Sequence, residues 1–388
     1  MTITSRLRLI SLLASCLLLL YPLGVQAKEQ DKGHIPPSPG SHAHAVTLMD
    51  VTSGRILYEH NGDEELPIAS LTKIMTAIVA IEHGKLSDKV KVGRAAYGKE
   101  GSSIYLHLGE EMTLENMLFG LMLRSGNDAA TAIAEHVGGS EEGFARLMNE
   151  KASLLGLTHS QFQNPHGLDA KNHYSSANDL AKLTAYALHN PDFREIVKTQ
   201  VKQAPNPNDP WDYKWINKNK MLRFYEGADG VKTGYTKIAK RCLVSSATRN
   251  GQQLVVVTIN DGDDWNDHRK LLDYGFAHFP LVEIVKKGQT VQSGIVAGAA
   301  FKYALNEAET ELVEKKLVLH EENPLRFGYR GELQISLGEQ PIGKVPLYKR
   351  GSVPAAPKLY QQVYSSTDHK PGWLRSLQDA LRALFSGD

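Results

Sequence analysis

Three short motifs stand in a fixed order along this 388-residue chain, and they can act together only if the fold brings three distant segments to one place. They are Ser70-Leu71-Thr72-Lys73, Ser125-Gly126-Asn127 and Lys232-Thr233-Gly234. Their side chains supply a nucleophilic hydroxyl, groups for proton transfer and a cation that can hold an anion. Each motif alone is a weak signal, but their order and context predict acyl transfer through a serine ester.

The first motif opens an apolar stretch. Residues 71–81 are apolar on nearly every face, which predicts a buried helix that ends at Gly84. Residues three apart lie on one helical face, so Lys73 is expected one turn behind the Ser70 hydroxyl. Burying a lysine without a role is costly, and Lys73 is therefore predicted to accept the proton of Ser70. The alternative is a Ser70 N-cap beside a lysine whose ammonium reaches water.

The second and third motifs are expected on a turn and on a strand. Residues 114–123 and 129–137 have helical patterns, so Ser125 and Asn127 are predicted in the short connection between two helices. Lys232 belongs to the first of three strand-like runs that predict an antiparallel meander, at residues 230–236, 242–249 and 254–259. Taken alone, the second motif could be an ordinary capping turn and Lys232 an edge-strand lysine.

With these motifs in place, the chain resembles the superfamily of penicillin-binding proteins and serine β-lactamases. Within it, the chain is similar to the low-molecular-weight D-alanyl-D-alanine carboxypeptidases of peptidase family S11. The likeness is carried by separate stretches at residues 45–50, 53–58, 67–77, 101–103, 123–130, 164–168, 173–176 and 229–236. A weaker likeness continues to about residue 365.

The resemblance implies a role for each motif residue. Ser70 would be the nucleophile, Lys73 its general base, and Ser125 the group that passes a proton to the leaving D-alanine. The residues implied in substrate binding are Asn127, Lys232, Thr233, Gly234 and Tyr235, with the backbone N–H groups of Ser70 and Tyr235 as the oxyanion hole. The implied substrate is a peptidoglycan stem peptide ending in D-Ala-D-Ala, and β-lactams are the implied covalent inhibitors. No cofactor is expected.

The turn after the third motif departs from the family pattern. Relatives commonly have Ala-Gly before a Cys-Leu-Val strand, whereas this chain has Ala239-Lys240-Arg241 before Cys242. A glycine usually provides backbone freedom at this point, so the turn is expected to differ. The form of residues 233–244 is similar to a branch associated with the spore cortex.

Other reactions of the superfamily use the same parts. Class A β-lactamases place a water-activating Glu in the loop after the second motif, but residues 162–180 contain none, so rapid penicillin hydrolysis is not expected. A non-hydrolytic peptidoglycan- or β-lactam-binding protein would have a damaged motif, and all three are complete. The predicted function is therefore a serine D,D-carboxypeptidase, with a D,D-transpeptidase or endopeptidase as the alternative.

The start of the chain has the features of a secretory signal. Arg6 and Arg8 precede an apolar core at residues 9–23, and Ala27 closes a small-residue cleavage site. An uncleaved anchor and a lipoprotein modified at Cys16 are the alternatives. Cleavage would leave Cys242 as a single cysteine, which excludes an intramolecular disulfide. We expect the mature protein at the outer face of the cytoplasmic membrane or in the cell wall.

Charge and histidine spacing exclude other classes of function. A formal net charge of +1 gives no argument for nucleic-acid binding. The 15 histidines show no H-E-x-x-H spacing, and His42 and His44 lie in a Pro-, Ser- and Gly-rich leader. We therefore predict no metal site.

The predicted fold class is α/β (α+β), in which a β-lactamase/penicillin-binding-protein-like domain with an antiparallel sheet and helices precedes a small all-β sandwich. The expected segments are a signal peptide (1–27), a disordered leader (28–44), the catalytic domain (45–279), the sandwich (280–350), a linker (351–371) and an amphipathic helix (372–388). The terminal helix has an apolar stripe of Trp373, Leu374, Leu377, Leu381, Leu384 and Phe385. The stripe predicts an in-plane membrane helix, and the alternative is a helix docked on the sandwich.

Overall fold

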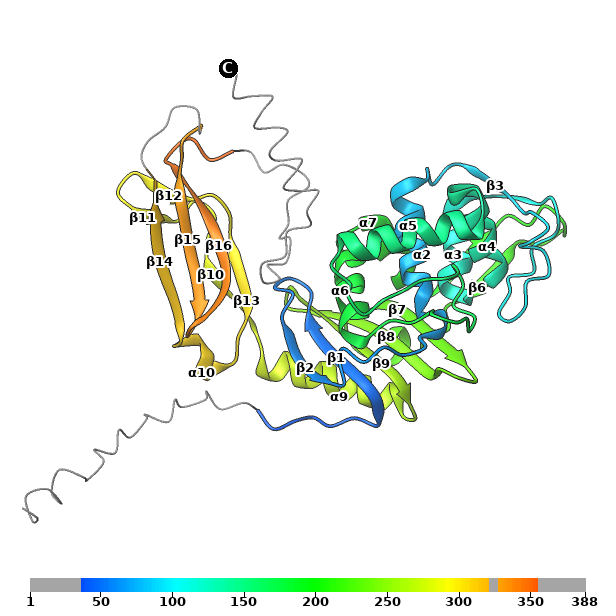
Figure 1. Cartoon of the computed structure of the whole chain (residues 1–388), viewed down its shortest axis with the longest axis horizontal. Helices are drawn as coiled ribbons and strands as arrows, with labels where there is room; N and C mark the ends of the chain where they lie inside the picture. The colour runs from blue at the N-terminus through cyan, green and yellow to red at the C-terminus, as the bar shows by residue number, and fades with distance from the viewer. Residues whose placement is uncertain (1–35, 321–326, 355–388) are drawn as a thin grey trace, which may run out of the picture. The chain divides into compact units, whose positions relative to one another are not determined.

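The computed structural model describes residues 36–320 and 327–354 (Figure 1). The predicted signal peptide and terminal helix lie outside the described residues. The described chain forms an α/β part up to the end of helix α9 (Asp264–His278) and then an all-β part. Among the described residues, no helix combines the length and the apolar character needed to cross a membrane.

The α/β part is built on a five-stranded antiparallel sheet with the order β2-β1-β9-β8-β7. The strands are β1 (Ala43–Asp50), β2 (Ile56–His60), β7 (Ala228–Thr236), β8 (Lys240–Arg249) and β9 (Gln252–Asp261). The predicted meander is confirmed as β7-β8-β9. Strand β1 begins two residues before the predicted domain start at residue 45, because Ala43 already pairs with Asp261 on β9.

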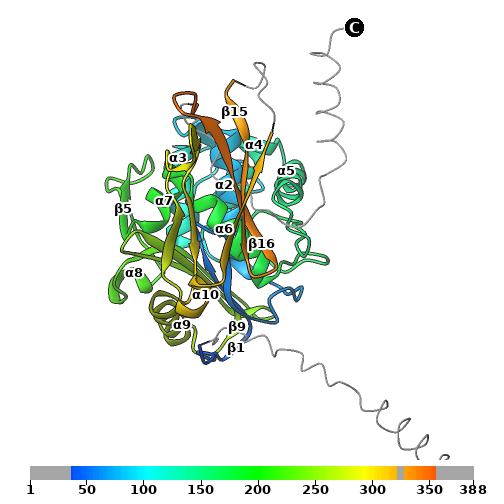
Figure 2. The ribbon, with the colours of Figure 1, turned by 90° about the vertical axis from the view of Figure 1, so that its left-hand side faces the viewer.

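Both faces of this sheet are covered, which explains why its central strands are apolar at nearly every position. On β1 and β9, alternate residues enter two different cores: Val46 and Val256 face one, while Met49 and Val257 face the other. Helix α9 packs on the first face and α6 (Ala177–Leu188) on the second. Figures 1 and 2 show α9 separated from the larger group of helices by the sheet.

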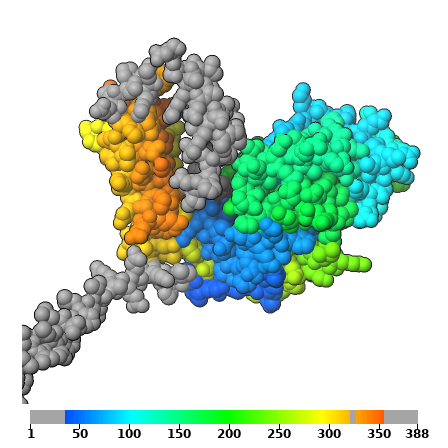
Figure 3. Space-filling model, in the orientation of Figure 1, coloured from blue at the N-terminus to red at the C-terminus, as the bar shows by residue number. Residues whose placement is uncertain are grey.

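The larger helical group surrounds α2 (Lys73–His83), which follows a short 3₁₀ turn, η1 (Ala69–Thr72). The buried helix predicted over residues 71–81 is confirmed, and it ends at Gly84. The other helices on this face of the sheet are α3 (Leu114–Phe119), α4 (Asn127–Gly138), α5 (Glu141–Leu154), α6 and α7 (Pro191–Lys198). Helix α8 (Met221–Phe224) lies on the other face, where Met221 shares the core of α9 and Phe224 contacts Trp265. In the space-filling view, the green surface of these helices borders the cyan surface of the loops after β3 (Lys89–Lys91) (Figure 3).

The predicted helix over residues 114–123 divides into α3 and a wider, π-type turn, η2 (Gly120–Arg124). Ser125 ends this turn with a left-handed backbone conformation, φ +64°. Two short hairpins flank the helices: β3 pairs with β4 (Glu111–Thr113), and β5 (Val201–Ala204) pairs with β6 (Tyr213–Ile216). Ser125 and Gly126 form the predicted connection between η2 and α4, whereas Asn127 is already the first residue of α4.

The all-β part has a five-stranded sheet, β11-β12-β16-β15-β14, and the hairpin β10-β13. Its elements are β10 (Leu281–Val285), β11 (Thr290–Gln292), β12 (Ile295–Ala297), β13 (Phe301–Ala304), α10 (Glu307–Thr310), β14 (Val313–Leu319), β15 (Tyr329–Leu337) and β16 (Gln340–Lys349). Both sheets contribute to one core, with Val285 and Phe301 from the hairpin packed with Ile335 and Val345 from the larger sheet. This arrangement confirms the predicted small β-sandwich.

Candidate active site

The structure brings the first two motifs together around the ammonium group of Lys73. Its Nζ lies 3.0 Å from Ser70 Oγ, 2.7 Å from Asn127 Oδ1 and 2.5 Å from the backbone oxygen of His166. Asn127 is fixed in turn, since its Nδ2 donates to the backbone oxygen of Glu100 at 2.7 Å. Lys73 is the first residue of α2 and has no solvent exposure. The predicted closeness of Ser70 and Lys73 is confirmed by this geometry.

Burial changes the proton affinity of Lys73. Loss of water around the ammonium, followed by repulsion from Lys218, lowers the pKa of Lys73 to about 7, and attraction to Asp128 opposes the change. A lysine with this pKa is present partly as the neutral amine near neutral pH. It can therefore accept a proton from a hydroxyl 3.0 Å away.

Ser125 is buried and stands two residues before Asn127 on the chain. No hydrogen bond joins its hydroxyl to Ser70 or Lys73 in the part of the chain that the structure describes. Its left-handed backbone is unusual for a residue other than glycine, and such conformations are concentrated at functional sites. The backbone N–H of Asn127 donates to the backbone oxygen of Ser102 at 2.7 Å, which ties this turn to the loop after residue 100.

The third motif runs along β7 beside η1. A Cβ atom added to Gly234 would lie 3.2 Å from the backbone nitrogen of Ser70, so only glycine allows the strand to pass this close without a shift. The neighbouring Tyr235 is exposed, and Thr233 is partly buried. Lys232 is almost completely buried, and its Nζ donates to the backbone oxygen of Thr233 at 2.7 Å.

Positive charge accumulates at this site. Burial, then repulsion from Lys73 and Lys218, holds the pKa of Lys232 well below its ordinary value. Lys218 is exposed and its Nζ donates to Ser102 Oγ at 3.1 Å, while loss of water around its stem and repulsion from Arg124 lower its pKa. Across the described residues, none of these three lysines has a carboxylate within ion-pair distance. The arrangement is suited to an anionic ligand.

Three contributors were not identified from the sequence. Lys218 adds the third cation, and the backbone oxygen of His166 adds an acceptor for Lys73. Asp128 fixes the loop beside the site by accepting hydrogen bonds from Ser103 Oγ at 2.6 Å and from two backbone N–H groups. The stretches at residues 101–103 and 164–168 did carry the family resemblance, which was the available signal. A backbone oxygen, however, has no signature in residue type.

The turn after β7 is where the sequence departs from the family pattern, and a backbone different from that of relatives stays a prediction. Lys240 stands where relatives commonly have glycine, and its φ is +60°, in the region that favours glycine. The side chain of Cys242, two residues on, is buried among the core residues, and burial raises the pKa of its thiol to about 12. The thiol is therefore inert, as a small buried hydrophobe would be.

In the described part of the chain, one group of side chains could offer ligands to a metal ion. His42, Asp263 and Asp267 have ligand atoms within 4.8 Å of one another. Asp267 Oδ2 already accepts the backbone N–H of His42 at 2.5 Å, and the His42 ring lies 3.1 Å from the same oxygen. Because these contacts satisfy the carboxylate without an ion, and because His42 and Asp263 are exposed, we assign no metal to this group.

Comparison with known proteins places this site in a known class. Residues 32–263 match the family model described as D-alanyl-D-alanine carboxypeptidase, Peptidase_S11. The chain is 38% identical over 296 residues to D-alanyl-D-alanine carboxypeptidase DacF of Bacillus subtilis, covering 73% of this chain and 75% of that protein. Two crystal structures are also similar. Penicillin-binding protein 5 from Haemophilus influenzae has a TM-score of 0.68 at 27% identity, over 80% of this chain and 97% of that one. Penicillin-binding protein 6B from Escherichia coli has a TM-score of 0.66 at 30% identity, and the match covers 80% of this chain and 96% of that one.

The fold and site thus define a serine peptidase of the penicillin-binding type. The chain belongs to the D-alanyl-D-alanine carboxypeptidase family. The predicted family, fold class and serine carboxypeptidase activity are confirmed by these matches.

Proposed function

We propose that Ser70 is the nucleophile of a carboxypeptidase that removes the terminal D-alanine from peptidoglycan stem peptides ending in D-Ala-D-Ala. The observation that supports this assignment is the fully buried Lys73, with a pKa of about 7 and its Nζ 3.0 Å from Ser70 Oγ. The neutral amine of Lys73 takes the hydroxyl proton while Oγ attacks the scissile carbonyl carbon. Backbone N–H groups of Ser70 and Tyr235 hold the resulting oxyanion.

The leaving step and the hydrolytic step use the same groups. Ser125 donates a proton to the nitrogen of the departing D-alanine as the C–N bond breaks and regains one from the Lys73 ammonium, which leaves an ester on Ser70 and Lys73 neutral again. A water molecule then attacks the ester, Lys73 accepts its proton, and Ser70 Oγ recovers a proton as the shortened peptide departs. Asn127 keeps Lys73 in place by accepting from its Nζ at 2.7 Å.

The substrate carboxylate is assigned to the third motif. Lys232 and the Thr233 hydroxyl bind the terminal carboxylate, and Gly234 lets the strand approach the scissile bond. The support is electrostatic, since the buried Lys73 and Lys232 and the exposed Lys218 bring three amino groups to the site without an ion-paired carboxylate among the described residues. A carboxylate would supply the missing negative charge.

The first test is direct. The purified mature protein is incubated with a stem pentapeptide ending in D-Ala-D-Ala, and released D-alanine is measured beside any cross-linked product. Release of D-alanine without cross-linking supports the carboxypeptidase. Cross-linked product in excess would favour the transpeptidase alternative, for which the Streptomyces K15 DD-transpeptidase structures are similar neighbours with a TM-score of 0.59. The residue labelled by a β-lactam is identified by intact-mass and peptide analysis. A label on a residue other than Ser70 would overturn the assignment of Ser70 as the nucleophile.

We also propose that the mature enzyme acts outside the cytoplasm and is held at the membrane by residues 372–388. The support is the signal-like start of the chain and the apolar stripe of the terminal segment. Full burial of a large apolar side chain is worth about 1.5 kcal/mol or more. Partial burial of six such side chains would therefore give several kcal/mol of free energy for partitioning to the membrane. A variant ending at Pro371 should remain in the supernatant with liposomes and keep its carboxypeptidase activity, whereas the mature chain should sediment. Loss of folding in that variant would favour the docked-helix alternative.

A role in the spore cortex stays a prediction based on residues 233–244.

A further inference from the structure

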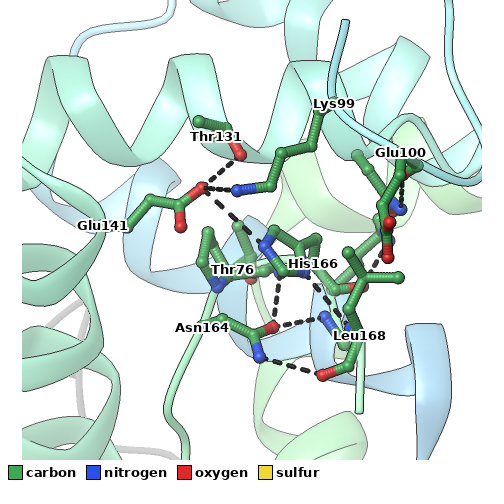
Figure 4. A network of polar contacts seen from close by, with 12 residues as sticks. Thr76, Lys99, Glu100, Thr131, Glu141, Asn164, His166 and Leu168 are labelled. Carbon is green, nitrogen blue, oxygen red and sulfur yellow. Dashed lines mark hydrogen bonds and ion pairs between the residues drawn. The ribbon is translucent and has the colours of Figure 1, made fainter. Parts of the chain in front are cut away.

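The carboxylate of Glu141 lies at the centre of a polar network that the catalytic scheme does not use (Figure 4). Glu141 is the first residue of α5. Its Oε1 accepts from Lys99 Nζ at 2.7 Å and from the Thr131 hydroxyl, and lies 3.7 Å from His166 Nε2. Burial by itself would raise the pKa of Glu141, but the contacts from His166, Lys99 and Thr131 outweigh it and lower the pKa to about 2. Glu141 is therefore an anion throughout the working pH range.

The contact with His166 depends on which ring nitrogen bears the proton. The backbone N–H of Leu168 donates to His166 Nδ1 at 3.2 Å, so Nδ1 is the acceptor and Nε2 carries the hydrogen. Burial, only partly offset by Glu141, lowers the pKa of His166, and the ring is neutral at neutral pH. A neutral ring in this tautomer still directs its N–H toward the Glu141 carboxylate.

The loop that contains His166 is held on both sides. Asn164 Oδ1 accepts the backbone N–H of Gly167 at 2.7 Å, and Asn164 Nδ2 donates to the backbone oxygen of Leu168 at 3.0 Å. The Thr76 hydroxyl on α2 donates to the backbone oxygen of Pro165 at 2.6 Å. The side chain of His166 points to Glu141, and its backbone oxygen contacts Lys73 Nζ at 2.5 Å.

We propose that Glu141 is a positioning residue for the catalytic base, because it fixes the His166 side chain and so holds the backbone oxygen of His166 against Lys73. This proposal rests on the proposed role of Lys73 in acylating Ser70. Glu141 touches neither the nucleophile nor the base. It acts through one residue, and Lys99 and Thr131 keep its carboxylate directed toward that residue.

The consequence for Lys73 has a definite sign. A hydrogen bond to an ammonium group favours the charged form, so losing the His166 oxygen lowers the pKa of Lys73 and leaves a weaker base. The other titratable groups that interact with Lys73 are Lys218, Lys232, Asp128, His166 and His173. Those that interact with Glu141 are Lys99, His166 and Glu135. A substitution at residue 141 leaves all these side chains in place, but removing the Glu141 charge lowers the pKa of His166 further and removes one cause of the raised pKa of Glu135.

The test is the rate at which a penicillin acylates Ser70, measured from pH 5 to pH 9 in the mature protein. Glu141→Gln keeps the side-chain volume and removes the charge. We expect its plateau rate to fall about tenfold, equal to about 1.4 kcal/mol in the barrier, and its midpoint to move to lower pH. Glu142→Gln is the matched control, since it makes the same change one residue along, at an exposed position of the same helix, and should leave both values unchanged.

A second variant separates positioning from general stability. His166→Ala removes the side chain that Glu141 holds, so it should reproduce the shift, and adding Glu141→Gln to it should have little further effect. Lys99→Gln removes one of the two groups that direct the Glu141 carboxylate, so it should give a smaller change of plateau and midpoint in the same direction.

An unchanged plateau and midpoint in folded Glu141→Gln would overturn the proposal. Equal losses in Glu142→Gln, or additive losses in the double variant, would also overturn it. If Glu141→Gln does not fold, an unchanged midpoint in His166→Ala decides against it. A wild-type protein that is not labelled at Ser70 would instead overturn the proposed function.

Discussion

The surroundings of the two buried lysines, Lys73 on α2 and Lys232 on β7, differ in how far they satisfy a positive charge. Lys73 Nζ has three oxygen acceptors within 3.0 Å: a serine hydroxyl, an amide oxygen and a backbone carbonyl. Lys232 Nζ donates to one backbone oxygen, that of the residue next to it. Both side chains are almost completely removed from water.

This difference indicates two kinds of chemistry for one residue type. Lys73 has its partners in place before any ligand arrives, and burial brings its pKa to about 7, where gain and loss of a proton are both easy. Lys232 lacks a negatively charged partner among the described residues and is next to two other cations. An incoming carboxylate would relieve this deficit, raising the pKa of Lys232 and lowering the cost of burying its charge.

The largest effect is expected from removing the base. Lys73→Ala should reduce penicillin acylation of Ser70 by about 10³-fold, within the range found for general bases. Its melting temperature should hold or rise, because a buried cation is lost. Lys85→Ala, at an exposed position just after α2, is the control and should acylate normally. Labelling of Lys73→Ala at the wild-type rate would mean that another group takes the proton.

Removing Lys232 should affect substrates according to their charge. Lys232→Ala should lower kcat/KM by about 30- to 100-fold for a peptide with a free terminal carboxylate, as expected for a lost charge-assisted hydrogen bond. The loss should be several times smaller for the same peptide amidated at its end. Lys237→Ala, exposed in the turn after β7, should change neither value. Equal losses of kcat/KM for both peptides would show that Lys232 does not bind the terminal carboxylate.

The pH dependence of acylation tests whether burial tunes the pKa of Lys73. Because Lys73 must be neutral to accept a proton and has a pKa of about 7, the rate should fall about tenfold per unit below pH 7 and level off above it. Stopped-flow acylation by a chromogenic β-lactam would measure this fall in rate. A fall centred near the ordinary pKa of lysine would show that burial does not lower the pKa of Lys73.

Sequence reasoning could locate much of this molecule because local pattern and fold agree. The apolar run after Ser70 and the strand runs around Asn250 each had a clear signature. The acceptor on His166, the cation of Lys218 and the anchoring carboxylate of Glu141 had none. Their roles arise from contacts between segments distant in the sequence, such as the 93 residues that separate Lys73 from His166. Residue type and spacing alone do not encode such contacts.

The smallest effect is expected at the turn that joins β7 to β8. Lys240 has φ +60°, and a left-handed residue with a side chain costs about 1–2 kcal/mol. Glycine removes that cost but gives the unfolded chain about 0.5–1 kcal/mol of extra entropy. Lys240→Gly should therefore raise the free energy of unfolding by about 0–1.5 kcal/mol, measured by urea denaturation.

The control makes the same exchange three residues earlier. Lys237 is not among the residues with positive φ, so Lys237→Gly should destabilise the protein by about 0.5 kcal/mol or more. If Lys240→Gly raises the free energy of unfolding and Lys237→Gly lowers it, then the lysine at position 240 holds the backbone in a strained conformation that glycine would relieve. If Lys240→Gly also changes the preference for a free carboxylate over an amide, then the turn sets the position of Lys232. An unchanged preference would show that Gly234, packed against the backbone of Ser70, fixes β7 without help from the turn.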